Sequence, residues 1–104
     1  MPNPKRGEVW LVDLGMVAKV RPCLILSVSY GDNDRALVTV VPHSTKTRSS
    51  DFEIVIDMKF LRPGAFVTQN LMTISVVKLL RKLGDMSASD LKFVEDSVRA
   101  WLGL

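Results

Sequence analysis

The 104-residue sequence lacks the residues on which several classes of protein depend. Its one cysteine, Cys23, excludes an internal disulfide and a multi-cysteine metal cage, and its apolar neighbours predict a buried, inert thiol. No GxGxxG, P-loop, GxSxG or HExxH motif occurs, and no metal-ligand cluster surrounds the one histidine, His43. No signal peptide or membrane-length apolar run is present. We therefore expect a cytosolic protein that uses neither cofactor nor metal.

The composition is that of an ordinary globular domain. Apolar residues make up 47% and charged residues 24% of the chain, and the length suits one domain over residues 1–104. Fourteen Lys and Arg stand against eleven Asp and Glu, giving a net charge of +3. This balance permits an anionic partner without proving one, and a few placed cations would have to bind it.

Short apolar segments separated by turn signals predict a β-rich core. We expect strands at residues 8–14, 21–29, 35–42 and 52–58, and one or two short strands within 65–75. The Gly, Asp and Asn residues of 30–34 predict a turn that joins the second and third strands as a hairpin.

The last twenty residues change to a helical period. Apolar residues recur at 91, 94, 98 and 101, between a capping pair of Ser87 and Asp90 and a C-terminal Gly103. Trp101 falls on the apolar stripe, where we expect it to pack in the core. The predicted fold is mainly β with α (α+β): a small, strongly bent antiparallel sheet or barrel with a C-terminal amphipathic helix.

Polar residues gather where two of the predicted strands meet. Lys19 and Arg21 enter one strand, and His43, Ser44, Thr45 and Lys46 follow the other. An antiparallel hairpin would bring Arg21 close to His43 and Ser44. The set suits cleavage of RNA through its 2′-hydroxyl, since Arg21 offers donors matched to phosphate and Ser44 adds another. His43 has a side chain whose pKa suits proton transfer near neutrality.

Simpler interpretations of the same residues stay open at this point. Arg21 could be solvated or paired with Asp13 or Glu53, and on these residues alone that interpretation is the stronger one. His43 is more simply a solvated or hydrogen-bonded loop residue, and Ser44 a turn residue. Lys46 and Arg48 are more simply part of a solvated basic loop.

Five ordered segments carry a resemblance to a known family. "RGEVWLVDL", "RPCLIL", "VTVVPHST", "FEI" and "LGDMSASDLKFVEDSVRAWLGL" together resemble the MazF/PemK toxins of type II toxin–antitoxin systems, from about residue 5 to the C-terminus. The resemblance implies an SH3-like, mostly antiparallel barrel that forms a homodimer. It also implies a metal-independent endoribonuclease that cuts single-stranded RNA, leaving a 2′,3′-cyclic phosphate and a 5′-hydroxyl. A cognate antitoxin with an acidic tail would neutralise it.

The resemblance assigns roles to individual residues. The arginine of the family's "RP" motif falls on Arg21 and the hydroxyl after "VVP" plus one residue falls on Ser44, which makes them the expected catalytic pair. His43, at a position that is more often aliphatic, is a hypothetical proton-transfer group. The RNA-binding residues we expect are Lys19, Thr45, Lys46, Arg48 and Gln69.

Two departures from the family pattern bear on activity. Met72 stands where many members have the arginine of a "Q-[IV]-R-T-[VI]" segment, and the loop at residues 15–20 is shorter than usual. These departures motivate one alternative, a catalytically weakened member that binds antitoxin. A second alternative is a CcdB-like poison of DNA gyrase, since that family shares the fold and "RAWLGL" bears a superficial likeness to its C-terminal tail.

Overall fold

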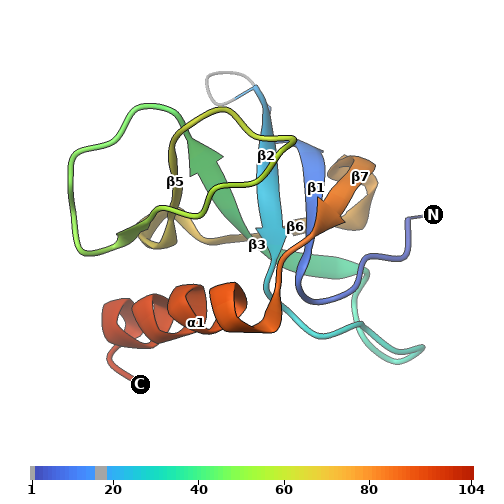
Figure 1. Ribbon diagram of the computed structural model, residues 1–104. Coiled ribbons are helices and arrows are strands. Elements are labelled where there is room, and N and C mark those ends of the chain that lie inside the picture. Colours follow the sequence, from blue (N-terminus) through green and yellow to red (C-terminus); the bar gives the residue numbers. More distant parts are fainter. Residues whose placement is uncertain (1, 16–18) are drawn as a thin grey trace.

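Antiparallel strands and one C-terminal helix form the domain (Figure 1). The computed structural model describes residues 2–15 and 19–104. The elements found in these residues are β1 (Glu8–Asp13), β2 (Val20–Ile25), β3 (Leu37–Ser44), β4 (Glu53–Ile54), β5 (Ala65–Val67), η1 (Thr68–Asn70), β6 (Met72–Ser75), η2 (Val76–Lys78), β7 (Leu79–Asp85) and α1 (Ala88–Leu102). The predicted class, an antiparallel β-structure with a C-terminal helix, is confirmed.

The sheet bends around its longest strand, β3. The strand order is β4-β5-β3-β2-β1-β7, and β6 pairs with the first half of β3. Along one edge of β3 the partner changes from β6, where Met72 faces Val40, to β5, where Phe66 faces His43. The other edge of β3 pairs with β2, where Cys23 faces Pro42. In the described residues β4 and β7, at the two ends of this order, do not pair with each other. The expected barrel is therefore an open, strongly bent sheet.

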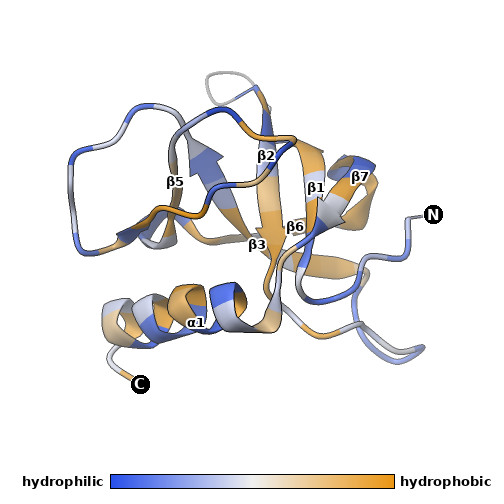
Figure 2. Ribbon diagram, viewed as in Figure 1, coloured by the Kyte–Doolittle hydropathy of each residue, from blue (hydrophilic) through white to orange (hydrophobic). Residues whose placement is uncertain are grey.

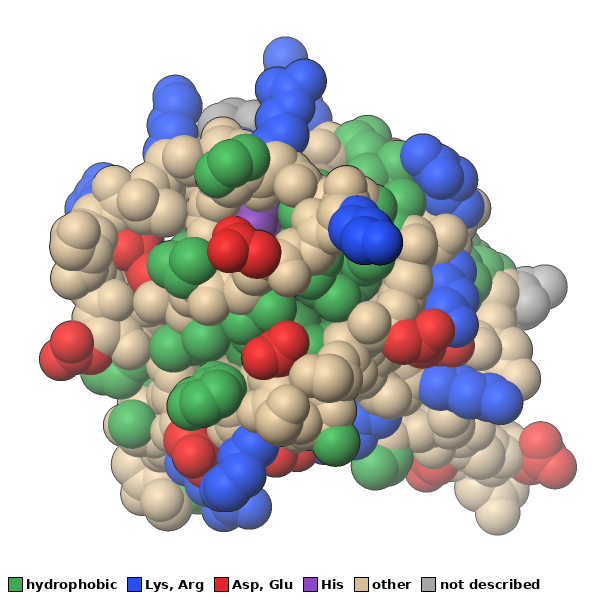
Figure 3. All heavy atoms as spheres, viewed as in Figure 1, with side chains coloured by type: hydrophobic (Ala, Val, Ile, Leu, Met, Phe, Trp, Pro, Cys, Tyr) green, Lys and Arg blue, Asp and Glu red, His purple; other side chains and the backbone are tan. Residues whose placement is uncertain are grey.

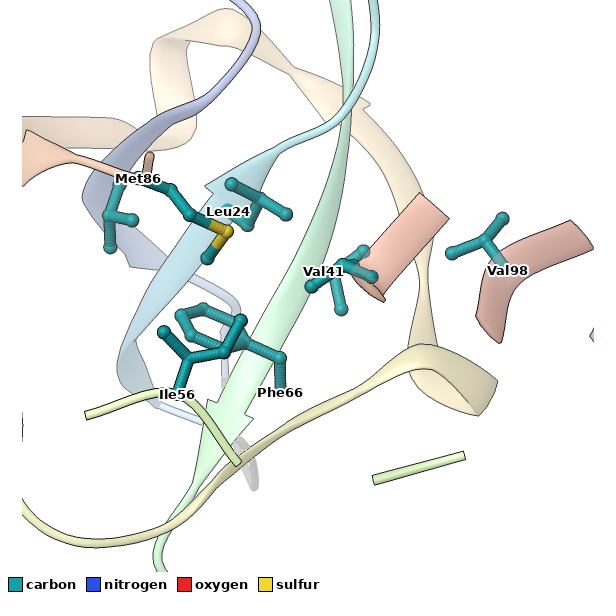
Figure 4. Packing of buried hydrophobic residues seen from close by; sticks show 8 residues of the cluster. Leu24, Val41, Ile56, Phe66, Met86 and Val98 are labelled. Carbon is teal, nitrogen blue, oxygen red and sulfur yellow. The ribbon is translucent and has the colours of Figure 1, made fainter. Parts of the chain in front are cut away.

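Strand alternation divides the core into two clusters, one on each face of the central strands. Cys23 and Ile25 of β2 pack in one cluster, while Leu24, between them, packs in the other. Figure 2 shows the resulting hydrophobic run along β1, β2 and β3. Figure 4 shows the second cluster, in which Leu24, Val41, Ile56, Phe66, Met86 and Val98 gather. Burial raises the pKa of Cys23 to about 12, so this thiol stays protonated, as the sequence predicts.

The predicted strands at 8–14, in the hairpin and within 65–75 are confirmed, whereas the one at 52–58 is shorter than expected and β7 was not expected. β2 and β3 pair antiparallel across the predicted turn. The alternation at 52–58 marks burial more than pairing: Ile56 is buried and Val55 is 67% exposed, but the strand ends at Ile54. Its partner β5 offers only three residues. β7 was not predicted, because its sequence LLRKLGD does not alternate.

The helix α1 has the predicted caps and covers one end of the sheet (Figure 1). The Ser87 hydroxyl accepts from the amide of Asp90 at 3.2 Å, and Gly103 ends the helix at φ 71°. The core packing expected of Trp101 is wrong: its side chain is 42% exposed and packs edge-on against Phe52 at the surface, with ring centroids 5.3 Å apart. No helix within the described part of the chain is long and apolar enough to cross a membrane.

Candidate active site

Arg21 and Ser44 come from neighbouring strands and line one cavity. Leu24 faces Val41 and Cys23 faces Pro42, so the same register carried two residues further sets Arg21 opposite Ser44. Alternation places both on the face of Cys23 and Pro42. The cavity between them, here called the Ser44 cavity, has a volume of about 300 Å³ and is lined by Leu14, Arg21, Pro42, His43, Ser44, Val67, Asn70 and Met72. The proximity expected from the hairpin is thus present; the catalytic roles remain predictions.

The Ser44 hydroxyl is held by a tight local turn. Its Oγ donates to the carbonyl of Lys46 and accepts from the amide of Lys46, both at 3.1 Å. Such a turn fixes the position of the oxygen at the end of β3 while the residue stays partly exposed. The turn-residue interpretation of Ser44 is therefore correct, and the hydroxyl can donate to a ligand only by turning its one hydrogen away from the Lys46 carbonyl.

Arg21 makes no ion pair with either acid proposed for it. The carboxylate of Asp13 accepts from the amide of Gly15 at 2.9 Å, and that of Glu53 accepts from the amides of Arg48 and Ser50 at 2.7 and 3.1 Å. Among the described residues, Arg21 belongs to none of the salt bridges. Its guanidinium therefore remains available to an anion.

His43 is a buried strand residue rather than the loop residue expected. It is 3% exposed, and its ring packs edge-on against Phe66 of β5 with centroids 5.1 Å apart. Because successive residues of a strand point to opposite faces, its imidazole faces away from the Ser44 side chain. Burial and then the charge of Arg21 lower the pKa of His43 below its usual 6.5, so it is neutral near pH 7. Its Nε2 has no hydrogen-bond partner among the described atoms.

Two further cavities flank the Ser44 cavity. The Lys46 cavity, of about 380 Å³, shares Ser44, Val67 and Asn70 with it and is also lined by Lys46, Arg48, Ser50, Glu53 and Gln69. The Phe60 cavity, of about 450 Å³, shares Arg21 and His43 with it and is also lined by Leu11, Val20, Pro22, Thr45, Phe60, Leu61 and Arg62. Figure 3 shows the histidine side chain in a small opening of the molecular surface.

The predicted RNA-binding residues divide among these cavities. Lys46, Arg48 and Gln69 line the Lys46 cavity, and Thr45 lines the Phe60 cavity. Lys19 is exposed and lines none of the three. The carboxylate of Glu53 accepts from two amides of the basic loop, and these bonds, the one from Arg48 first, lower the pKa of Glu53. The short loop at 15–20 falls partly outside the described residues, at positions 16–18.

Sequence reasoning missed three residues at these cavities. Asn70 lines both the Ser44 cavity and the Lys46 cavity. It could have been identified from its place between Gln69, an expected RNA-binding residue, and Met72, where many members of the family have an arginine. Phe60 and Arg62 line the Phe60 cavity but carry no local signal. Met72 does lie at the Ser44 cavity. In the part of the chain that the structure describes, no group of three or more His, Cys, Asp or Glu side chains could hold a metal ion.

Comparison with known proteins gives concordant results. Residues 5–102 match the family described as "PemK-like, MazF-like toxin of type II toxin-antitoxin system". An endoribonuclease in complex with its cognate antitoxin from a mycobacterial species is 25% identical, with a TM-score of 0.83 over 97% of this chain and 96% of that one. The Mycobacterium tuberculosis toxin MazF-mt6 is 27% identical, with a TM-score of 0.80 over 93% and 97%. A MazE–MazF structure from Deinococcus radiodurans, 17% identical, shares the fold with a TM-score of 0.82 over 100% and 99%.

Proposed function

This chain belongs to the PemK-like, MazF-like toxin family of type II toxin–antitoxin systems, and we propose that it acts there as an endoribonuclease on single-stranded RNA. One observation carries the proposal: Arg21 and Ser44, from different strands, line the same cavity, and Arg21 has no ion pair among the described residues. Two solved relatives at 25% identity or above are an endoribonuclease bound to its antitoxin and a MazF toxin.

The proposed reaction is a transesterification within the RNA. The 2′-oxygen forms a bond to the adjacent phosphorus while the bond from phosphorus to the 5′-oxygen breaks. The 2′-hydroxyl loses its proton and the departing 5′-oxygen gains one, so a 2′,3′-cyclic phosphate and a 5′-hydroxyl result without water or metal. Arg21 would donate to the non-bridging oxygens, whose charge grows in the transition state, and Ser44 would add an O–H donor.

The mechanism also needs a group that takes the 2′-proton and one that supplies a proton to the 5′-oxygen. His43 was the hypothetical candidate, and its role stays a prediction. The lowered pKa of His43 would leave it neutral and able to accept a proton near pH 7. However, its ring is buried and faces away from Ser44, so it would have to act from the opposite side of β3.

The partners proposed are single-stranded RNA, a second copy of the chain and an acidic antitoxin. The cations Lys46 and Arg48 line the Lys46 cavity, which shares lining residues with the Ser44 cavity. Both RNA and an acidic antitoxin tail are polyanions and would be attracted to these cations. Because phosphate contacts release counterions, RNA binding through these few cations should weaken as salt is raised.

The direct test is cleavage of mixed single-stranded RNA by the whole protein in EDTA, with the new ends identified chemically. We expect cyclic phosphate and 5′-hydroxyl ends, and a loss of about 10²–10³ in rate for Arg21→Ala and for Ser44→Ala. Arg35→Ala, which removes an exposed arginine outside the three cavities, should cut at the wild-type rate. Intact RNA, or cleavage that Arg21→Ala leaves unchanged, would refute the proposal.

The exposure of Trp101 keeps the gyrase alternative as a second candidate. Core packing was the argument against it, and this side chain is 42% exposed near the C-terminus. Inhibition of gyrase supercoiling by the wild type and its loss in Trp101→Ala, with RNA left intact, would favour that function. Binding of an acidic antitoxin peptide with neither activity would identify a catalytically weakened member, consistent with Met72 at the Ser44 cavity.

A further inference from the structure

We propose that the Phe60 cavity binds the base of a nucleotide next to the phosphate held by Arg21, and so contributes to the choice of cleavage sequence. The inference rests on the proposed function and adds a specificity site on the face of β3 opposite Ser44. Neither Phe60 nor Arg62 lines the Ser44 cavity, so this site is distinct from the proposed catalytic pair.

Continuity through Arg21 is the first support. Arg21 lines both the Ser44 cavity and the Phe60 cavity, so the two openings adjoin at this residue. A phosphodiester has a nucleoside on each side. With the phosphate on Arg21, one of the flanking nucleosides would lie over the Ser44 cavity and the other would be directed to the Phe60 cavity.

The walls of the Phe60 cavity suit a base with a phosphate beside it. Phe60 is 39% exposed, and a Cβ at Gly84 would come within 2.5 Å of its ring, so the ring rests directly on the β7 backbone. Support on one side and exposure on the other suit a stacking platform. Arg21 and Arg62 supply positive charge, and no carboxylate of the described residues lines the cavity.

His43 gives the cavity an unsatisfied polar atom. The residue is 3% exposed and lines this cavity, and its buried Nε2 has no partner among the described residues. A neutral imidazole has one donor and one acceptor nitrogen, and a buried nitrogen left unpaired costs free energy. The donor and acceptor groups on a base edge could satisfy it, and an apolar ligand could not. An acidic peptide would match the arginines, but it would match neither this neutral nitrogen nor the open aromatic face as well.

The test separates base preference from chemistry. Randomised single-stranded RNA is cut by the wild type, by Phe60→Ala and by Arg62→Gln, and the cut sites are sequenced. We expect each variant to lose about 5- to 100-fold of the wild-type preference at one position beside the cut, with preferences elsewhere unchanged. Phe93→Ala and Arg35→Gln remove the same side-chain types from exposed positions outside the cavity and should keep the wild-type pattern. Phe60→Leu, with its melting temperature measured, separates lost stacking from misfolding.

Affinity for an uncleavable 2′-O-methyl RNA decides the outcome if the wild type does not cut. A drop in affinity for Phe60→Ala and Arg62→Gln but not for the controls would support the base site although the catalytic proposal had failed. An unchanged cut-site pattern and unchanged affinity would overturn the base site, whether or not RNA is cut. Loss of binding to an acidic peptide alone would overturn it in favour of a peptide site.

Discussion

Replacing Gly64 by alanine should disturb the candidate active site through backbone packing alone. A Cβ at this position would overlap the carbonyl oxygen of Ser44 and lie 3.0 Å from its carbonyl carbon and 2.8 Å from Cε1 of His43. Gly64 has no positive φ, so the cost is one of space and not of backbone strain. Since two of the three contacts are to backbone, β3 or the loop before β5 must shift. Overpacking of this kind costs about 1–3 kcal/mol.

That cost converts into measurable quantities. A loss of 1 kcal/mol lowers the melting temperature of a domain of this size by about 4–8 °C, so a loss of about 1–3 kcal/mol should lower it by about 4–24 °C. Moving Ser44 by about 1 Å should also slow RNA cleavage by about 10²-fold. Thermal unfolding followed by circular dichroism and single-turnover cleavage measure the two effects.

Gly31 provides the matched control. A Cβ there meets only Oδ2 of Asp34, at 3.6 Å, which is ordinary contact, and its φ is not positive. Gly31→Ala should therefore unfold within about 0.5 kcal/mol of the wild type and cut RNA at the same rate. A Gly64→Ala protein with the melting temperature and cleavage rate of Gly31→Ala would refute the packing argument.

Three further substitutions test charge and protonation at the site. The pKa of His43 is lowered in the folded state, so on acidification the unfolded chain takes up this proton first. The free energy of unfolding of the wild type should therefore fall as the pH drops below about 6.5. In urea unfolding at several pH values, His43→Gln should lose less of this free energy over the same range. The same variant should keep the pH–rate profile of cleavage, because the ring faces away from Ser44, and a lost limb would instead make His43 the proton carrier. Met72→Arg, which adds a cation to the Ser44 cavity, should speed cleavage by about tenfold, and an unchanged or slower rate would count against a missing donor there. Glu53→Gln keeps an acceptor oxygen for the Arg48 and Ser50 amides but removes a negative charge from the Lys46 cavity. RNA should therefore bind more tightly with little change in melting temperature, and unchanged affinity in a filter-binding assay would count against RNA lying in this cavity.

The sequence predicted what depends on near neighbours in the chain. The β2–β3 hairpin follows from two apolar runs and the turn between them, and it alone brings Arg21 to Ser44. The caps of α1 at Ser87 and Gly103 are equally local. β7 could not be predicted, because its pairing with β1 is distant in sequence and interrupted by register shifts at two places.

The wrong end predicted for β3 and the missed cavity residues both depend on contacts between segments that are distant in the sequence. β3 was expected to end at Pro42, but the strand continues to Ser44 by pairing with β5, and this carries His43 into the core. Phe60 and Arg62 reach the site because Gly64 allows the loop before β5 to approach β3 closely. A turn signal predicts that the chain bends at Gly64, and it does not predict what the bend packs against.

The double-sided burial of β2 and β3 has a consequence for how such a toxin could diverge. Substitutions in these strands are confined to exchanges that keep apolar volume, since one face or the other would otherwise lose its packing. The cavity walls contributed by Phe60, Arg62, Gln69 and Asn70 come from outside β2 and β3, and these residues belong to neither core cluster. Changes in the recognised RNA could therefore accumulate along these rims while the strands that hold Arg21 and Ser44 stay as they are. The RNA sequence that is recognised could then change without any change in the packing that holds the fold together.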